Sequence, residues 1–354
     1  MAKILIKNGR IWDGKRFFSG DVLTNDTLIE KIDTKIEDRA DYIFDAEGKM
    51  VSAGLVDIHV HLKGLASDTF GVGAEISSFP FGVTAVNDAG SIHGDRTLLD
   101  HFQVKNTVFV GVNIKNNHAD FDIAEKGLEK YGDKAIGIKV YFDKSLNVKD
   151  ITPLKDICHF ARQKGLKVMV HCSKSPTSML DIVNTLSTGD ILTHVFHGGE
   201  NSCLDNDFEA LKAAKLKGVI LDAGFAGNVH TDFANFRKSV EAGFLPDTIS
   251  TDITCLSAYK RGGRYGMTMC MSLAYTAGIE ETDIFRMVTA APAMALGKES
   301  EWGYLKVGRV ADIAVLDYTD EGFDLIDESG NQMKNSMGYK CILTVCNGQI
   351  IYKN

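Results

Sequence analysis

Several features of other protein classes are missing from this chain of 354 residues. No apolar run approaches the roughly 18 residues that a membrane-spanning helix needs, so we expect no membrane partner. The seven cysteines are odd in number, and none forms a C-x-x-C pair. We therefore expect reduced thiols and a cytoplasmic location. Proline is scarce, with 5 residues against 34 glycines, which favours many tight turns between regular elements.

Positive charge is also in deficit, because 39 lysines and arginines face 47 acidic residues and the net charge is −8. No basic tract compensates locally, so nucleic acid is not an expected partner. A hydrophobic content of 44% with 24% charged residues is typical of a globular enzyme and excludes disordered and fibrous classes. Lys3, Lys7 and Arg10 interrupt the first apolar run, which predicts a strand and not a signal peptide.

Both ends of the chain have the pattern of β-structure. Asn8-Gly9 and Asn347-Gly348 each separate two short apolar runs. Such a pair predicts a β-hairpin, because both turn positions need positive φ. Residues 311–316 predict another strand. We expect residues 1–52 and 300–354 to form one small β domain that is split in the sequence.

The middle of the chain, residues 53–299, has a different pattern. Eight apolar runs rich in β-formers recur at steps of 24 to 32 residues, which fits a strand plus a covering helix each time. Alternating strands and helices predict parallel strands. Eight such units favour an α/β fold, a (β/α)₈ TIM barrel, over a six-stranded open sheet. The runs begin near Gly54, Gly82, Thr107, Ala135, Lys167, Ile191, Gly218 and Thr248.

Reactive side chains of a barrel collect at the C-terminal ends of its strands. His59 and His61 alternate with apolar residues in the first run, so both face one side and could hold one metal ion. Lys139 lies inside the fourth apolar run, where an unpaired ammonium is costly. Desolvation would lower its pKa, and the neutral amine could capture carbon dioxide as a carbamate that bridges two metals. Hydrogen-bonded core histidines and a solvated strand-end lysine are the alternatives.

Further candidates end the fifth, sixth and eighth runs, namely His171, His194 and Asp252. Each of these residues alone could have a purely structural role. Four histidines, a buried lysine and an aspartate at the mouth of one barrel together predict a metal centre. Five other histidines have no partner at the expected positions and are interpreted as structural or surface residues, with two of them, His118 and His230, near barrel loops. They are His93, His101, His118, His159 and His230. Cys172 and Cys255 are expected to be packing residues.

The pattern resembles the amidohydrolase superfamily in its binuclear form with a carboxylated lysine. Residues 48–61 resemble the first-strand signature of that family, and residues 290–297 with 308–315 resemble its closing signature. The resemblance implies a distorted barrel beside a β-sandwich built from both termini. It also implies that His59, His61, Lys139 and Asp252 hold one metal ion, and that Lys139, as N6-carboxylysine, joins His171 and His194 at a second.

Two divalent ions, which we expect to be zinc, suit this imidazole and carboxylate set. A hydroxide bridging them would attack an amide, cyclic amide or ester, and Asp252 would accept its proton. The branch that the chain resembles is often labelled dihydroorotase or adenine deaminase, and relatives there remove acetyl groups from hydroxy or amino acids. We therefore favour an N-acetyl amino acid or an acetylated hydroxy acid, a small substrate that carries a carboxylate.

Alternatives to this function are a dihydroorotase or cyclic amidase, an adenine-type deaminase and a non-catalytic barrel. Lys63 stands where dihydroorotase-like enzymes have a carboxylate-binding arginine, which weakens the first. The absence of an acidic residue soon after His171 argues against the deaminase. The presence of all six ligands argues against the non-catalytic barrel. No sequence feature decides the oligomeric state, and a homo-oligomer is suggested only by analogy with other barrels of this kind. Substrate contacts are assigned from position alone to Lys63, Tyr141, His197, Arg261 and Arg264.

Overall fold

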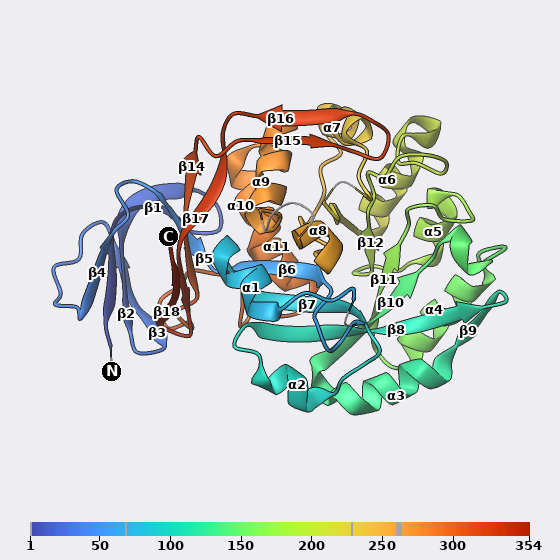
Figure 1. The fold of residues 1–354 in the computed structure, drawn as a ribbon, viewed down its shortest axis with the longest axis horizontal. Coiled ribbons are helices and arrows are strands. Elements are labelled where there is room, and N and C mark those ends of the chain that lie inside the picture. The colour runs from blue at the N-terminus through green and yellow to red at the C-terminus, as the bar shows by residue number, and fades with distance from the viewer. Residues whose placement is uncertain (1, 68, 228, 260–263) are drawn as a thin grey trace.

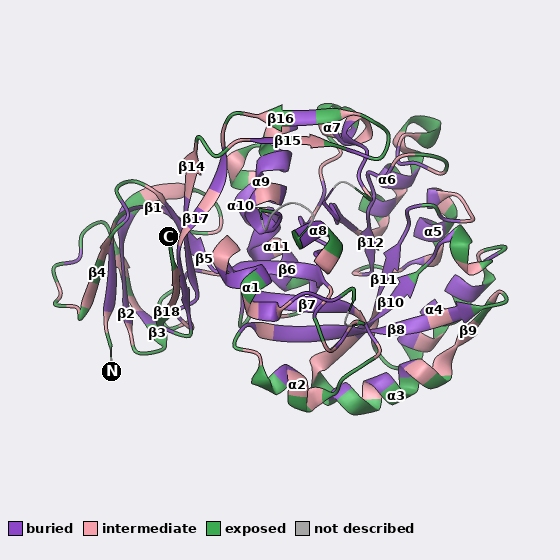
Figure 2. Cartoon of the chain, in the orientation of Figure 1, coloured by how far each residue is buried: buried purple, intermediate pink, exposed green. Residues whose placement is uncertain are grey.

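The computed structural model describes residues 2–67, 69–227, 229–259 and 264–354. A β-rich part contains both ends of the chain, and a larger part of alternating strands and helices contains the middle (Figure 1). Figure 2 shows strands that are buried along most of their length and outer helices with one exposed face. Among the described residues, no helix has the length and apolar character that a bilayer crossing requires.

The terminal part is one eight-stranded sheet that combines strands from both ends of the sequence. Its apolar core includes Ile6 and Val22 near the N-terminus and Ile313 and Val345 near the C-terminus. Pairing of β5 with β14 joins the two ends, because the two strands run antiparallel from Met50 to Ala53 and from Leu316 to Ile313. The strands are β1 (Ile4–Trp12), β2 (Phe17–Asn25), β3 (Leu28–Asp33), β4 (Tyr42–Asp45), β5 (Met50–Ala53), β14 (Ile313–Thr319), β17 (Gly338–Cys346) and β18 (Gln349–Lys353).

The two Asn-Gly pairs have different outcomes. Asn347 and Gly348 have φ of 50° and 74° and connect β17 to β18, so the C-terminal hairpin is confirmed. The N-terminal hairpin is wrong, because Asn8 and Gly9 lie within the continuous strand β1. The pairing of β1 with β2 shifts register there, which is a β-bulge that absorbs the positive φ of Asn8. The sequence predicted the positive φ of Asn8 correctly, but pairing with neighbouring strands determines that this residue forms a bulge within a strand and not a hairpin turn.

The middle of the chain forms the predicted barrel. Seven parallel strands pair in the order β13, β12, β11, β10, β8, β7, β6, while β9 adds antiparallel to β8. These strands read as nearly continuous buried runs because side chains pack on both faces of the sheet. They are β6 (Leu55–Val60), β7 (Val83–Ser91), β8 (Lys105–Lys115), β9 (His118–Asp120), β10 (Ala135–Tyr141), β11 (Lys167–His171), β12 (Ile191–Thr193) and β13 (Ile220–Asp222).

The eighth position of the barrel is irregular. Residues 248–253 form only single bridges, from Thr248 to Asp222 of β13 and from Ile253 to Val60 of β6. These bridges connect the two edges of the seven-stranded sheet. Asp252 has φ of 47°, which lies outside the extended region and interrupts the strand. His194, directly after β12, also has positive φ, at 67°. Such backbone strain is concentrated at functional sites.

Helices cover the outside of the barrel. In α4, Pro153 sits in the first turn, and Leu154, Ile157, Cys158 and Ala161 form the buried stripe expected at helical spacing. The helices are α1 (Ala74–Ser78), α2 (Arg96–His101), α3 (Phe121–Tyr131), α4 (Thr152–Gln163), α5 (Met179–Thr185), α6 (Asp205–Lys217), α7 (Phe233–Glu241), α8 (Cys255–Tyr259), α9 (Met267–Thr276), α10 (Glu281–Val288) and α11 (Ala290–Ala295). Short 3₁₀ turns are η1 (Phe79–Phe81), η2 (Gly132–Lys134) and η3 (Lys144–Leu146).

A two-stranded hairpin of β15 (Phe323–Ile326) and β16 (Gln332–Asn335) extends from the C-terminal strands along the barrel, above α9 and toward α7 (Figure 1). The buried carboxylate of Asp327 in its turn accepts hydrogen bonds from the backbone N–H groups of Ser329 and Asn331 at 2.9 and 2.8 Å. It also accepts one from Phe233 N, at the start of α7, at 2.6 Å. The hairpin turn is therefore attached to the barrel loops.

Candidate metal centre

A cavity of about 340 Å³ lies among the strand ends of the barrel. All six predicted ligands contribute to its wall, together with residues from the ends of β7 and β8. Three of the six belong to strands, since His59 is in β6, Lys139 is in β10 and His171 ends β11. The volume suits a small molecule. The polar wall residues are His59, His61, Ser67, His93, Asn113, Lys139, Tyr141, His171, His194, His230 and Asp252.

One group of side chains gathers around Asp252. Its Oδ1 lies 3.2 Å from His59 Nε2 and 2.9 Å from His61 Nε2. The amine of Lys139 lies 2.7 Å from His59 Nε2. The backbone holds this group, because Asp252 N donates to His59 O at 2.7 Å and His61 N donates to Ile253 O at 3.1 Å. The interrupted eighth strand thus places its carboxylate against the first strand.

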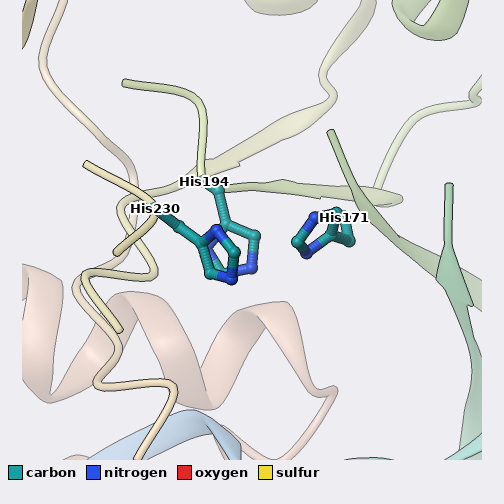
Figure 3. Close-up of side chains that lie close together, drawn as sticks. All are labelled: His171, His194 and His230. Atoms are coloured by element: carbon teal, nitrogen blue, oxygen red, sulfur yellow. The ribbon is translucent and has the colours of Figure 1, made fainter. Parts of the chain in front are cut away.

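A second group consists of three imidazoles, His171, His194 and His230, which Figure 3 shows close together. The ring centroid of His194 lies 4.6 Å from that of His171 and 4.5 Å from that of His230. One potential ligand atom from each of the three lies within 4.8 Å of the others. The same holds for His59, His194 and Asp252, so His194 belongs to both groups. This arrangement is compatible with two adjacent metal positions that have His194 between them.

Hydrogen bonds behind the imidazoles set their tautomers. Thr193 Oγ1 donates to Asp222 Oδ2 at 2.7 Å and therefore accepts from Nδ1 of His59, 3.1 Å away. His194 Nδ1 lies 2.6 Å from the carbonyl of Gly224, which can only accept. Each contact puts the proton on Nδ1 and leaves Nε2 as a bare ligand atom. His171 Nε2 lies 2.7 Å from Ser173 Oγ, a hydroxyl that can either donate or accept, so this contact is compatible with both tautomers of His171.

Burial controls the charges at this centre. It lowers the pKa values of His59, His171 and His194 well below their ordinary range, so these rings are neutral, as metal ligands must be. Burial also lowers the pKa of Lys139 to about 8, against the opposing pull of Asp252 and other carboxylates. For Asp252, burial acts to raise the pKa, but the surrounding imidazoles outweigh it and hold the value well below the usual range.

The donor set fits a metal ion. His194 Nε2 and Asp252 Oδ1 are buried without a hydrogen-bond partner of suitable geometry among the described residues. A buried polar atom without a hydrogen bond lowers the stability of the fold by about 1–3 kcal/mol. Two such atoms near one another indicate that a partner able to accept their lone pairs, such as a metal ion, binds there. Neutral imidazole and carboxylate are ligands that zinc and similar divalent ions take. The two groups could therefore hold one or two such ions.

The predicted substrate contacts are divided among different places. Tyr141 lines the cavity, and its hydroxyl donates to Asp143 Oδ2 at 3.2 Å. Lys63 is exposed and is not among the described residues that line the cavity. His197 lies in the wall of a neighbouring cavity, and Arg264 lines a groove between the barrel and the terminal sheet. Arg261 lies outside the described residues. The substrate contacts stay predictions.

From the sequence, His230 is interpreted as a structural or surface residue near a barrel loop. In the structure it lies in the second group and lines the cavity. It follows β13 in the loop before α7, so its place after the seventh strand was the available signal. His93 is exposed and also lines the cavity. Asp143 is a further correction, because it lies 3.9 Å from His171 Nε2 although it follows the fourth strand. A search for acids soon after His171 in sequence could not find it.

Cys172, next to His171, is a buried thiol that donates to the carbonyl of Thr193 at 3.1 Å. Burial raises its pKa far above the ordinary range, so it stays protonated and cannot act as a thiolate. All seven cysteines are free.

The fold and the site define a barrel enzyme with a histidine- and carboxylate-lined centre. The chain belongs to the amidohydrolase family, whose model matches residues 50–351. It is a hydrolase of that family. A deacetylase of Enterococcus faecalis is 28% identical over 373 residues, which cover 98% of this chain and 98% of that protein.

Solved structures have the same fold. An adenine deaminase is 25% identical, with a TM-score of 0.86 and coverage of 100% of both chains. A dihydroorotase is 22% identical, with a TM-score of 0.85, and the match covers 100% of this chain and 98% of that one. These neighbours are named for different reactions, so the fold alone does not select the substrate.

Proposed function

We propose that this protein is a binuclear metal-dependent hydrolase that removes an acetyl group from an N-acetyl amino acid or an acetylated hydroxy acid. The observation that carries the proposal is the gathering of four imidazoles, a buried lysine and a low-pKa aspartate around one small cavity. The choice of an acetyl group is supported by the deacetylase of E. faecalis, which matches almost end to end.

Six side chains would hold the ions, which we propose to be zinc. His59, His61 and Asp252 would serve one position and His171 with His194 the other, with Lys139 between them. A divalent ion bound there supplies Lewis acidity, which polarises a carbonyl group and lowers the pKa of water. We also propose a cytoplasmic location, which the free thiols support.

Lys139 would bridge the positions as a carbamate. With its pKa lowered to about 8, a substantial fraction of the amine is neutral in mildly alkaline solution. The neutral nitrogen adds to carbon dioxide, a new N–C bond forms, and one proton is released to solvent. This replaces a buried cation by an anion with two oxygen ligands, which removes the cost of burying an unpaired ammonium.

Asp252 would transfer the proton. Its pKa is held low, so it is ionised at neutral pH and can accept a proton from the attacking water. The same group can return that proton to the leaving amine or alkoxide. Tyr141, whose ring centroid lies 4.5 Å from that of His171, lines the cavity and would contact the substrate.

The test is a hydrolysis screen of protein loaded with zinc in the presence of bicarbonate. N-acetyl amino acids and acetyl hydroxy acids compete there with hydantoins, dihydroorotate and adenine. We expect turnover of acetylated compounds, two metal ions per chain, and loss of turnover in Asp252→Asn. Activity confined to dihydroorotate or a hydantoin would replace the proposed substrate class.

Adenine deamination is the second candidate, and the position of Asp143 is the observation that favours it. A carboxylate beside His171 could act as the acid and base partner of a mononuclear deaminase. Lys139 argues the other way, because a buried lysine between two ligand groups has no part in a mononuclear site. One metal ion per chain together with ammonia release from adenine would decide for the deaminase.

A further inference from the structure

The eighth position of the barrel presents its carboxylate from an unusual backbone conformation. Asp252 has φ of 47°, in the left-handed region that residues with a Cβ atom disfavour. The side chain of Thr251, directly before it, reaches Asp57 of β6. Asp252 itself reaches His59, two residues further along β6. Consecutive side chains of a regular strand point to opposite faces, so the left-handed conformation turns the chain and lets both neighbours reach β6.

The side chain and the amide of Thr251 are both held by Asp57. The carboxylate of Asp57, 2% exposed, accepts hydrogen bonds from Thr251 Oγ1 at 2.6 Å and from Thr251 N at 3.1 Å. It also accepts one from His59 N at 3.2 Å, so one carboxylate joins the first strand to the eighth position. Thr251 Oγ1 in turn accepts from Ile253 N at 3.1 Å. This contact spans the left-handed residue, because positions 251 and 253 flank Asp252.

The carbonyl group of Thr251 is fixed by a separate set of donors. The hydroxyl of Tyr265 donates to it at 2.6 Å, and Ala226 N donates to it at 2.9 Å. Tyr265 is buried and follows α8 in the chain. Ala226 lies after β13, in the loop that also contributes His230 to the second group of imidazoles. Thr251 thus connects the first strand, the loop after the seventh strand and the segment after α8.

These hydrogen bonds lie behind the site and not in it. Thr251, Asp57 and Tyr265 are not among the described residues that line the metal cavity. They can act on the centre only through the residues that they hold, above all Asp252. A purely structural role is the competing explanation, because each buried hydrogen bond also stabilises the fold. Positioning differs from it in one respect, since only positioning changes the metal centre of a protein that stays folded.

We propose that Thr251 is a positioning residue of the metal centre and that Asp57 and Tyr265 hold it in place. The inference rests on the proposed function, because it takes Asp252 to be a metal ligand and the proton acceptor of a hydrolase. Backbone strain of this kind persists only where the surrounding contacts hold it. Without them, Asp252 relaxes toward the extended conformations that most residues prefer, and its carboxylate leaves His59 and His61.

The first experiment compares the zinc affinity of two variants by competition with a chelator. Thr251→Val keeps the shape of the side chain but removes the hydroxyl, whereas Thr251→Ser keeps the hydroxyl. We expect Thr251→Val to bind zinc about 10- to 100-fold more weakly than the parent protein, as is typical when a group that orients a ligand is lost. Thr251→Ser should bind within about threefold of the parent protein.

Thr344→Val is the matched control for a purely structural role. Thr344 is fully buried in β17 of the terminal sheet, and its hydroxyl donates to the carbonyl of Phe79 at 2.7 Å. This variant also loses one buried hydroxyl, so it should lower the urea midpoint but leave zinc affinity within about twofold. Equal weakening of zinc binding in both valine variants would overturn the inference. So would a folded Thr251→Val that binds zinc as tightly as the parent protein.

Tyr265→Phe tests the same placement from outside the strand. It removes one hydroxyl, while Ala226 N still donates to the carbonyl of Thr251. We therefore expect a smaller effect, a loss of zinc affinity of about threefold to tenfold. Unchanged affinity would overturn the role of Tyr265 and, if Thr251→Val does not fold, the whole inference.

The zinc measurements separate failure of this inference from failure of the proposed function, because they do not depend on a substrate. If no acetylated compound is hydrolysed but Thr251→Val still binds zinc more weakly than Thr251→Ser, the positioning role stands and the deacetylase proposal falls. If acetylated compounds are hydrolysed and Thr251→Val keeps both kcat and zinc affinity, the reverse holds. A lower kcat at unchanged KM in Tyr265→Phe, together with weaker zinc binding, supports both.

Discussion

The contact between Thr193 and His59 leads to a sharp prediction about metal affinity. In Thr193→Val the shape is kept, but the acceptor of the His59 Nδ1 proton, 3.1 Å away, is removed. Asp222 keeps its other donors, Ser250 at 2.6 Å and Thr248 at 2.8 Å. The single group left unsatisfied is therefore the buried N–H of His59.

The magnitude follows from that count. One unpaired buried donor costs about 1–3 kcal/mol, so the metal-free variant should lose about 2 kcal/mol of unfolding free energy. The imidazole can avoid this cost by moving its proton to Nε2, but that tautomer has no lone pair left on Nε2, the atom that lies beside Asp252 and Lys139. Loss of such a supporting hydrogen bond typically weakens metal affinity about 10- to 100-fold.

Two assays check the prediction. Competition with a zinc chelator gives the dissociation constant, and urea unfolding of the metal-free protein gives the stability. Thr193→Ser keeps the hydroxyl and is the control, which should restore zinc affinity to within about threefold. If Thr193→Val folds normally and binds zinc as tightly as the parent protein, the tautomer argument for His59 is refuted.

The other predictions concern a proton, a carboxylate and a hairpin. The pKa of Lys139 is about 8 in the fold and 10.5 in the unfolded chain, so the unfolded state binds more protons between these pH values. The unfolding free energy of the metal-free protein should therefore rise by about 3 kcal/mol across that pH window. Urea titrations at pH 7.5 to 10.5 should show this rise, and Lys139→Met should lack it. Asp252→Asn should lower kcat about 10²- to 10⁴-fold, and retained turnover in the hydrolysis screen would remove it from proton transfer. Asp327→Ala leaves three backbone donors unpaired and should cost about 2 kcal/mol with faster amide exchange at Phe233, whereas the exposed Asp324→Ala should change neither.

The strand ends of the barrel were predictable because apolar runs, alternation and step length are local properties. His59, His171 and Lys139 could be placed at one mouth from the single rule that parallel strands end on the same side. Local rules failed where pairing partners decide the outcome. The Asn8-Gly9 pair has the right conformational preference for a turn, yet β1 continues through it because β2 pairs with both halves of β1, while β4 pairs with the first half and β5 with the second.

The site shows the same division. Asp143 and His171 lie on different strands, so no search along the sequence near His171 could join them. Asp222 reaches His59 only through Thr193, and these three residues come from three different strands of the barrel. The neighbouring cavity that contains His197 is also lined by Asp143 and Glu328, which lie almost two hundred residues apart in the printed sequence.

The order of residue types along the chain determined the class of fold and the imidazole, amine and carboxylate groups that meet at the mouth of the barrel, since these depend on periodicity and on chemistry carried by single residues. Tertiary structure decided which nitrogen of His59 and of His194 is free, how far burial lowers the pKa of Lys139, and which loops share a cavity wall. Those properties depend on distances between atoms and on exclusion of water, and both arise only when distant segments pack together.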